Sequence, residues 1–164
     1  MRITGLVAHG KQLGRTLGFP TVNVAPDGGA TPQAANGVWI GRITLSDGVP
    51  RPCMVNQGHH PTVPDGPPTI EAHILDYDGD VYGERVTLEY LRFLRPERRF
   101  DGVDALKAQL TRDREAVRAY FTDAAREKAS APAMSHDKNC LVVHRADVFQ
   151  HFCFCFFIKG AGSR

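Results

Sequence analysis

The sequence of 164 residues lacks any run of about 18 apolar residues, the length that a membrane-spanning helix requires. Its N-terminal residues also lack the apolar stretch and small-residue cleavage site of a secretory signal. A chain of this length supplies one domain rather than two. We therefore expect a cytoplasmic protein with no membrane partner.

The net charge of the chain is also small. The formal charge is +2 at pH 7, and the basic excess lies entirely after residue 128, so residues 1–128 are neutral. A neutral body lacks the broad basic surface with which proteins bind nucleic acid, and we expect no nucleic-acid partner. Four arginines nevertheless cluster, in a pattern compatible with a phosphate site or with a solvated surface. They are Arg92, Arg95, Arg98 and Arg99.

Cysteine is scarce before residue 129, where Cys53 stands alone and can form no disulfide within that region. A single cysteine there agrees with a reducing compartment. The remaining three, Cys140, Cys153 and Cys155, contain no CxxC pair, which makes zinc a poor interpretation of the C-terminal segment.

The C-terminal segment differs in composition from the rest of the chain. Residues 129–133 are rich in Ala, Ser and Pro, as linkers are, and five of the nine phenylalanines follow between Phe149 and Phe157. This run is too short to span a bilayer and too apolar for a solvated tail. We expect a domain at 1–128 and an atypical tail at 129–164 that is not part of it, with a docking element as the alternative.

The region before residue 96 has the pattern of short strands separated by turns. Residues 69–77 alternate, with Ile70, Ala72 and Ile74 on one face and the intervening residues on the other. Short strands without helices between them pair antiparallel, and closing the sheet into a small barrel removes its exposed edges. The other strands are expected at 38–45, 53–56 and 86–93, with turns at Ser46-Asp47-Gly48 and, as a hairpin, at Asp78-Gly79-Asp80.

The periodicity then changes to that of a helix. Asp101 is a suitable N-cap, and Asp104 lies near the positive end of the helix dipole. Apolar residues recur at intervals of three, four and seven residues, which predicts an amphipathic helix over roughly 103–126. They are Leu106, Leu110, Val117, Phe121 and Ala124, and we expect this stripe to face the barrel wall.

The run from Gly14 to Val24 is the most informative segment for chemistry. Thr21 and Asn23 are two residues apart after Pro20, so in an extended segment both side chains point the same way. A hydroxyl and a carboxamide are oxygen ligands that suit Mg²⁺, with phosphate oxygens and water completing the shell. The alternative is a turn-rich entry to a strand in which both side chains bond their own backbone.

Two further groups are candidates. Glu71 lies with His73 on the non-core face of the 69–77 strand, where a carboxylate could serve as a general base or could simply be solvated. Tyr82 and the segment 95–100 place aromatic rings near arginines, a combination that suits phosphate and planar-ring binding.

Together these segments resemble the riboflavin kinase family, in order and spacing, over about residues 4–126. The resemblance rests on Gly-Phe-Pro-Thr-x-Asn at 18–23 and on four further stretches. In bacteria this module is usually the C-terminal half of a bifunctional enzyme, and the present sequence is similar to the kinase module without the adenylyltransferase domain. The other stretches are Val55-Asn56-Gln57-Gly58 with Pro61-Thr62, Ile70 to Asp76, Tyr82-Gly83, and Leu94 to Phe100.

The resemblance implies a mainly β fold, a six-stranded antiparallel Greek-key barrel with a C-terminal helix. It implies transfer of the ATP γ-phosphoryl group to the 5′-hydroxyl of riboflavin, giving FMN and ADP, with Mg²⁺ or another divalent cation. By position, Glu71 matches the catalytic base, and Thr21 and Asn23 match the metal ligands. The implied ATP-binding residues are Arg15, Thr21, His73, Asp76 and Tyr82, and the implied flavin-binding residues are Arg95, Arg98 and Phe100.

Three positions depart from the family pattern. Val22 replaces the usual alanine, and Gln57 and the pair His59-His60 replace apolar and arginine positions. None of these changes removes a proposed catalytic group. The alternative function is a flavin- or nucleotide-binding barrel without turnover, and in either case we expect a monomer.

Overall fold

The computed structural model describes residues 1–10, 13–29, 32–58 and 68–130. The segment Met1–Ala131 forms one compact unit. Residues 131–164 of the tail predicted at 129–164 and the pair His59-His60 lie outside the described residues, so the expected domain boundary stays a prediction.

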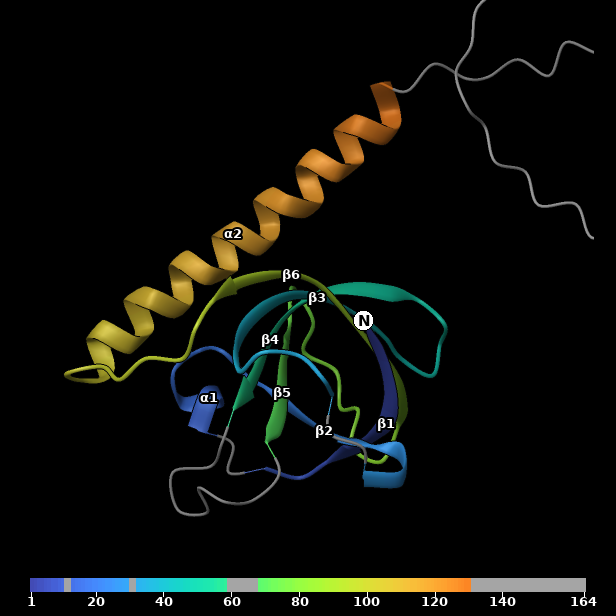
Figure 1. Ribbon diagram of the computed structural model, residues 1–164, viewed down its shortest axis with the longest axis horizontal. Helices are drawn as coiled ribbons and strands as arrows, with labels where there is room; N and C mark the ends of the chain where they lie inside the picture. Colours follow the sequence, from blue (N-terminus) through green and yellow to red (C-terminus); the bar gives the residue numbers. More distant parts are fainter. Residues whose placement is uncertain (11–12, 30–31, 59–67, 131–164) are drawn as a thin grey trace, which may run out of the picture. The chain divides into compact units, whose positions relative to one another are not determined.

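Six antiparallel strands close into a barrel in the order β1-β2-β5-β4-β3-β6 (Figure 1). A long helix, α2 (Val103–Ser130), follows the last strand. The predicted fold class is therefore confirmed. The strands are β1 (Arg2–Ala8), β2 (Val22–Pro26), β3 (Gly37–Thr44), β4 (Pro50–Gly58), β5 (Thr69–Ile74) and β6 (Arg85–Arg95), with a short helix α1 (Leu13–Thr16) and a 3₁₀ turn η1 (Asp27–Gly29) between the first three.

Strands β3 to β6 form a Greek key, because β6 returns to lie beside β3 rather than beside β5. The turn at Ser46-Asp47-Gly48 joins β3 to β4, as predicted. The predicted hairpin at Asp78-Gly79-Asp80 is wrong, since β5 pairs with β2 and β4 and does not pair with β6. This segment instead carries the chain from β5 across to β6.

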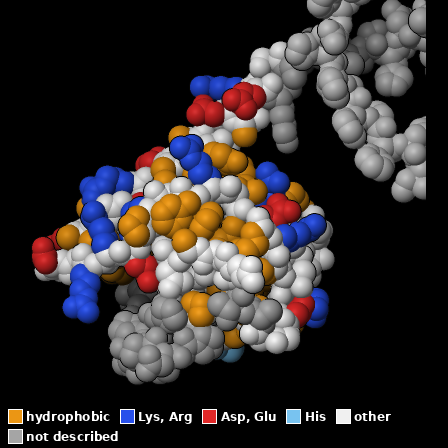
Figure 2. Space-filling view, in the orientation of Figure 1, with side chains coloured by type: hydrophobic (Ala, Val, Ile, Leu, Met, Phe, Trp, Pro, Cys, Tyr) orange, Lys and Arg blue, Asp and Glu red, His pale blue; other side chains and the backbone are white. Residues whose placement is uncertain are grey.

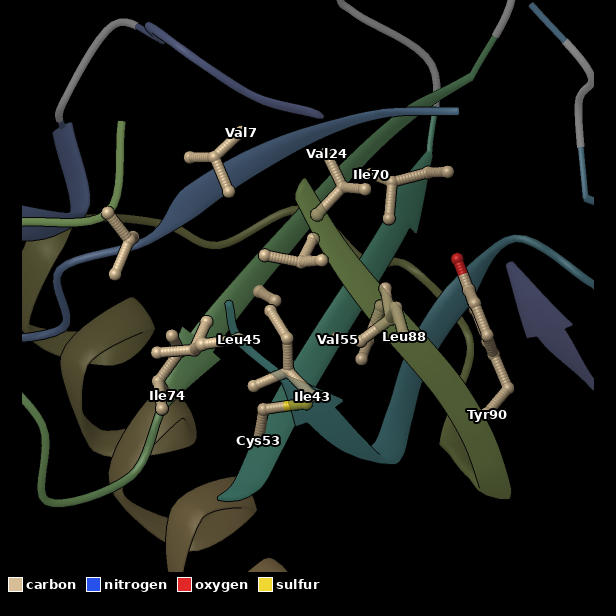
Figure 3. Close-up of a cluster of buried hydrophobic side chains, with 13 residues drawn as sticks. Val7, Val24, Ile43, Leu45, Cys53, Val55, Ile70, Ile74, Leu88 and Tyr90 are labelled. Carbon is tan, nitrogen blue, oxygen red and sulfur yellow. The ribbon is translucent and has the colours of Figure 1, made fainter. Parts of the chain in front are cut away.

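The barrel interior is filled by alternate residues of every strand (Figure 3). In β5 the inward residues are Ile70, Ala72 and Ile74, as the alternation predicted, and none is more than 4% exposed. The neighbouring Val22 and Val24 of β2 also pack against this core, so the branched side chain that departs from the family pattern at position 22 points inward. Burying such side chains is the main stabilising contribution to the fold.

A second apolar layer covers the outer face of β3 and β4. Val117 of α2 is fully buried there, beside Val38, Ile40 and Met54. Figure 2 shows apolar side chains gathered over the barrel next to α2 and charged side chains toward the far end of the helix. The Gly102 carbonyl accepts the first helical hydrogen bond, so the cap lies one residue after the predicted Asp101.

Gln57, the second departure from the family pattern, is 1% exposed inside the barrel. Its amide nitrogen donates to the Ala34 carbonyl at 2.9 Å, and the Tyr90 hydroxyl donates to its amide oxygen at 3.0 Å. A buried amide with both ends bonded costs little, so Gln57 is accommodated without loss of the core.

A chain ending at Ser130 should keep cooperative thermal unfolding and become more soluble than the full chain. The described members of both apolar layers lie between residues 3 and 121, and removing a Phe-rich segment lowers the tendency to aggregate. Circular dichroism on heating and the saturating concentration of each chain measure the two effects. Loss of cooperative unfolding on truncation would show that the tail belongs to the domain.

Candidate functional site

A polar row crosses the outside of the barrel where three strands meet. Asn23 of β2 is paired in register with Glu71 of β5, and Glu71 is paired on its other side with Asn56 of β4. Residues paired in this way lie on the same face of a sheet with neighbouring Cβ atoms about 5 Å apart. The strands therefore place a carboxylate between two carboxamides.

Asn56 is a member of this row that the prediction did not assign to the site. The alternation around it contained the signal, because Val55 and Gln57 point inward and Asn56 therefore points outward. Its position beside Glu71 depends on the β4–β5 register, which a single strand's pattern does not reveal.

The loop before β2 brings Thr21 to one end of the row. The Gly14 carbonyl accepts hydrogen bonds from the amides of Leu17, at 3.1 Å, and Phe19, at 2.8 Å, and folds the chain back toward β2. A Cβ at position 14 would lie 2.2 Å from the Phe19 carbonyl oxygen, and Gly18 has a φ of 79°. Glycine is therefore required at both positions for the loop to close.

Gly10 forms the opposite wall of this end of the site. A Cβ there would lie 1.9 Å from the carboxamide nitrogen of Asn23, so the Asn23 side chain rests directly against the glycine backbone. The close approach limits the rotamers that Asn23 can adopt, and its carboxamide is held near the paired Glu71.

A cavity of about 340 Å³ opens beside Thr21. Three of the predicted nucleotide-binding residues, Arg15, Thr21 and Tyr82, line it. The Tyr82 ring stacks on His9 with centroids 3.9 Å apart. The structure thus brings these three predicted residues together around one opening, whose lining also includes Val22, the neighbour of Asn23 on β2.

The other two predicted nucleotide-binding residues, His73 and Asp76, line a second cavity of about 340 Å³ that also contacts α2. The Asp76 carboxylate accepts a hydrogen bond from Arg118 at 2.5 Å. Burial lowers the pKa of the His73 imidazole below its ordinary value, and the positive charge of Arg114 lowers it further, although the hydrogen bond to the Pro20 carbonyl opposes both effects. His73 is therefore a neutral, buried group near pH 7.

The predicted flavin-binding arginines have different surroundings. Arg95 makes a bidentate ion pair with Asp113 of α2, at 2.7 to 3.1 Å, and Asp113 is only 3% exposed. Both Arg95 and Arg98 also place their guanidinium groups over the Phe100 ring, at 5.8 and 4.7 Å. Arg95 thus anchors the segment before α2, and its partner Asp113 is a residue that the sequence reasoning missed.

The donor atoms at the row suit a small hard cation. Within the described ranges no group of three His, Cys, Asp or Glu side chains could hold a metal ion. The hydroxyl of Thr21, the carboxamide of Asn23 and the carboxylate of Glu71 are oxygen donors of the kind that bind Mg²⁺ together with phosphate oxygens. Because Gly10 already holds the Asn23 carboxamide beside Glu71, the residues present fit such an ion.

A family model described as Flavokinase, riboflavin kinase, matches residues 1–121. The chain belongs to the riboflavin kinase family. The bifunctional riboflavin kinase/FMN adenylyltransferase of Haemophilus influenzae is 35% identical over 120 residues, which are 73% of this chain and 38% of that protein. The chain therefore spans less than two fifths of the length of this relative.

Two solved structures share the fold. A chain described as a macrolide-efflux protein from Streptococcus pneumoniae has a TM-score of 0.64 and 34% identity, over 71% of this chain and 38% of that one. Riboflavin kinase from Trypanosoma brucei has a TM-score of 0.57 and 22% identity, over 79% and 82% of the two chains, and shows the fold alone. Among the helices that the structure describes, none is long and apolar enough to cross a membrane.

Asp113→Asn should destabilise the domain by about 3–5 kcal/mol, because it leaves the Arg95 guanidinium partly buried without its counter-charge. Chemical denaturation with a linear extrapolation measures the change. Asp123→Asn is the matched control on the same helix, since Asp123 is 69% exposed and its contact with Arg126 spans 3.9 Å. Equal, small effects of both substitutions would show that the Arg95–Asp113 pair does not hold this segment.

Proposed function

We propose that this chain transfers the γ-phosphoryl group of ATP to the 5′-hydroxyl of riboflavin, giving FMN and ADP. The observation that carries the proposal is the register pairing of Asn23 with Glu71, two residues along the chain from Thr21, which lines the first cavity. The family match supports the same reaction. Phosphoryl transfer depends mainly on positioning and on charge stabilisation, and a rigid strand pair supplies the positioning.

In this reaction the riboflavin oxygen bonds to the γ-phosphorus while the bond from that phosphorus to the β–γ bridging oxygen breaks. ADP leaves, and the hydroxyl proton passes to the Glu71 carboxylate. Glu71 is half-buried on the outward face of β5, so it can meet a hydroxyl from outside the barrel without disturbing Ile70 and Ala72. Glu71 therefore has the general-base role in the proposal.

Thr21 and Asn23 would hold Mg²⁺ together with the phosphate oxygens of ATP. When bound, the cation neutralises charge that develops on the β- and γ-phosphate oxygens. Thr21 presents its hydroxyl from the fixed end of the Gly14 loop, and Asn23 presents its carboxamide from the Gly10 wall. Both ligands are neutral, so the phosphates and Glu71 supply the negative charge.

The first cavity is the proposed nucleotide site, since its size lies in the range of small-ligand pockets and Arg15, Thr21 and Tyr82 line it. The flavin would lie on the other side of Glu71, toward Arg98 and Phe100, where a cation and a ring already stack. Arg95 contributes there indirectly, because Asp113 holds its guanidinium. His73 and Asp76 line the second cavity instead.

The proposal concerns the kinase reaction alone. The relative from Haemophilus influenzae carries two activities in its name, and this chain matches 38% of its length. A cytoplasmic location and a monomeric state remain predictions. The alternative, a barrel that binds flavin or nucleotide without turnover, differs in one outcome: it forms no ADP.

Incubation with riboflavin, ATP and Mg²⁺ should yield FMN and ADP in equal amounts, separated by chromatography. Glu71→Gln should lower turnover on the order of 10²-fold, because it removes the base but keeps the shape, while riboflavin affinity stays nearly unchanged. Glu89→Gln is the matched control, a half-buried glutamate of β6 that pairs with Arg2 and Arg42. Equal losses of binding and turnover would make Glu71 a flavin ligand, and unchanged turnover would return it to a solvated strand residue.

Thr21→Ala and Asn23→Ala should each raise the Mg²⁺ concentration needed for half-maximal turnover by roughly tenfold or more, because each removes an oxygen ligand. Titration of Mg²⁺ at fixed ATP measures the shift. Thr87→Ala, a half-buried threonine of β6, controls for loss of a strand threonine. Wild-type Mg²⁺ dependence in either variant would remove that residue from the metal site.

A further inference from the structure

His73 is a buried titratable side chain near the proposed site, with 6% of its surface exposed. Its Nδ1 lies 2.8 Å from the Pro20 carbonyl oxygen. A carbonyl only accepts hydrogen bonds, so Nδ1 carries the proton and donates to it. The imidazole of β5 is thus bonded to the loop that enters β2.

The bonded carbonyl belongs to the peptide group that joins Pro20 to Thr21. This group is planar, so fixing its oxygen also fixes the plane that contains the Thr21 nitrogen and Cα. The pyrrolidine ring of Pro20 already restricts φ on the other side of that peptide. The hydrogen bond from His73 therefore determines the direction in which Thr21 leaves the loop.

Phe19 of the same loop is also held by neighbouring side chains. The Phe19 ring lies edge-on to His73 with centroids 5.4 Å apart, and the Arg114 guanidinium of α2 lies 5.0 Å from the Phe19 centroid. Phe19 is 3% exposed in the apolar layer that contains Val117. Arg114, Phe19 and His73 thus form a continuous chain of contacts from α2 to the Pro20 carbonyl.

We propose that His73 is a positioning residue, which orients the Thr21 hydroxyl for Mg²⁺–ATP through the Pro20–Thr21 peptide and does not bind the nucleotide itself. The inference rests on the proposed function, since it takes Thr21 as the ligand. It differs from the sequence-based expectation that His73 lines the ATP site. The Nδ1 atom already serves the Pro20 carbonyl, and little of the ring is open to a ligand.

Three substitutions of the same residue separate the donor from the ring. His73→Asn places an amide nitrogen close to the position of Nδ1, whereas His73→Gln places it one bond further out, and His73→Phe keeps the ring without a donor. Ile40→Val, in the apolar layer beside Phe19, is the control for loss of packing alone. Should His73→Phe fail to fold, the comparison of His73→Asn with His73→Gln still tests the proposal.

Two measurements need no catalysis. In the ligand-free protein, amide hydrogen exchange of residues 18–24 should be faster in His73→Phe and His73→Gln than in the wild type. In His73→Asn the exchange should be slower than in those two variants and close to the wild-type rate. Calorimetric titration with ADP at increasing Mg²⁺ should show a Mg²⁺ requirement raised about 10- to 100-fold in the first two variants, the usual cost of losing a group that orients a metal ligand. ADP affinity without Mg²⁺ and riboflavin affinity should stay within about twofold.

The third measurement is turnover. We expect kcat to be about 10- to 100-fold lower in His73→Phe and His73→Gln and largely restored in His73→Asn. The proposal is overturned if all three variants lose stability, as Ile40→Val does, while the Mg²⁺ requirement and kcat stay at wild-type values. It is also overturned if ADP affinity without Mg²⁺ falls as far as with it, because His73 would then be a nucleotide ligand. A wild-type chain that binds Mg²⁺–ADP in this His73-dependent way yet forms no FMN would refute the proposed function and leave the positioning role intact.

Discussion

The fold and the site both depend on the short pairing between β2 and β5. Two register pairs, Val22 with Ala72 and Asn23 with Glu71, join these strands and close the barrel. One pair fills the interior and the other faces outward, so closure and the placement of polar groups are the same event. A slip of one residue would turn Asn23 into the core and Val22 to the outside, which the apolar interior opposes.

The apolar layer under α2 makes the pairing between β2 and β5 rigid. Strands of a small barrel can leave their outer face to water, but here Val38 and Ile40 of β3 and Met54 of β4 lie in the layer that contains Val117 of α2. Phe19 from the loop before β2 is part of the same layer. The loop that carries Thr21 is therefore anchored by hydrophobic packing, although its glycines would otherwise make it mobile. The packing of α2 against the barrel therefore also helps to hold the Thr21 side chain in place.

Local patterns predicted what depends on local physics. The alternation of residues 69–77 located both the core face and the outward Glu71. The hairpin expected at Asp78-Gly79-Asp80 failed because turn residues report that the chain bends and do not report which strands then pair. Asp113 was missed for a similar reason: it pairs with Arg95 across 18 residues, and on a helical face it looks like any solvated carboxylate.

The near-zero net charge of residues 1–128 has to be considered together with the charges at the proposed site. A neutral body argues against binding a long polyanion, whose affinity comes from many simultaneous phosphate contacts. It does not argue against a nucleotide whose charge is largely balanced by a bound cation. The polar row contains one carboxylate between two neutral carboxamides, and Arg15 at the cavity edge is exposed to solvent. Under the proposed function, the positive charge that phosphoryl transfer requires therefore arrives mainly with the substrate, and the protein contributes fixed oxygen ligands instead of a basic patch.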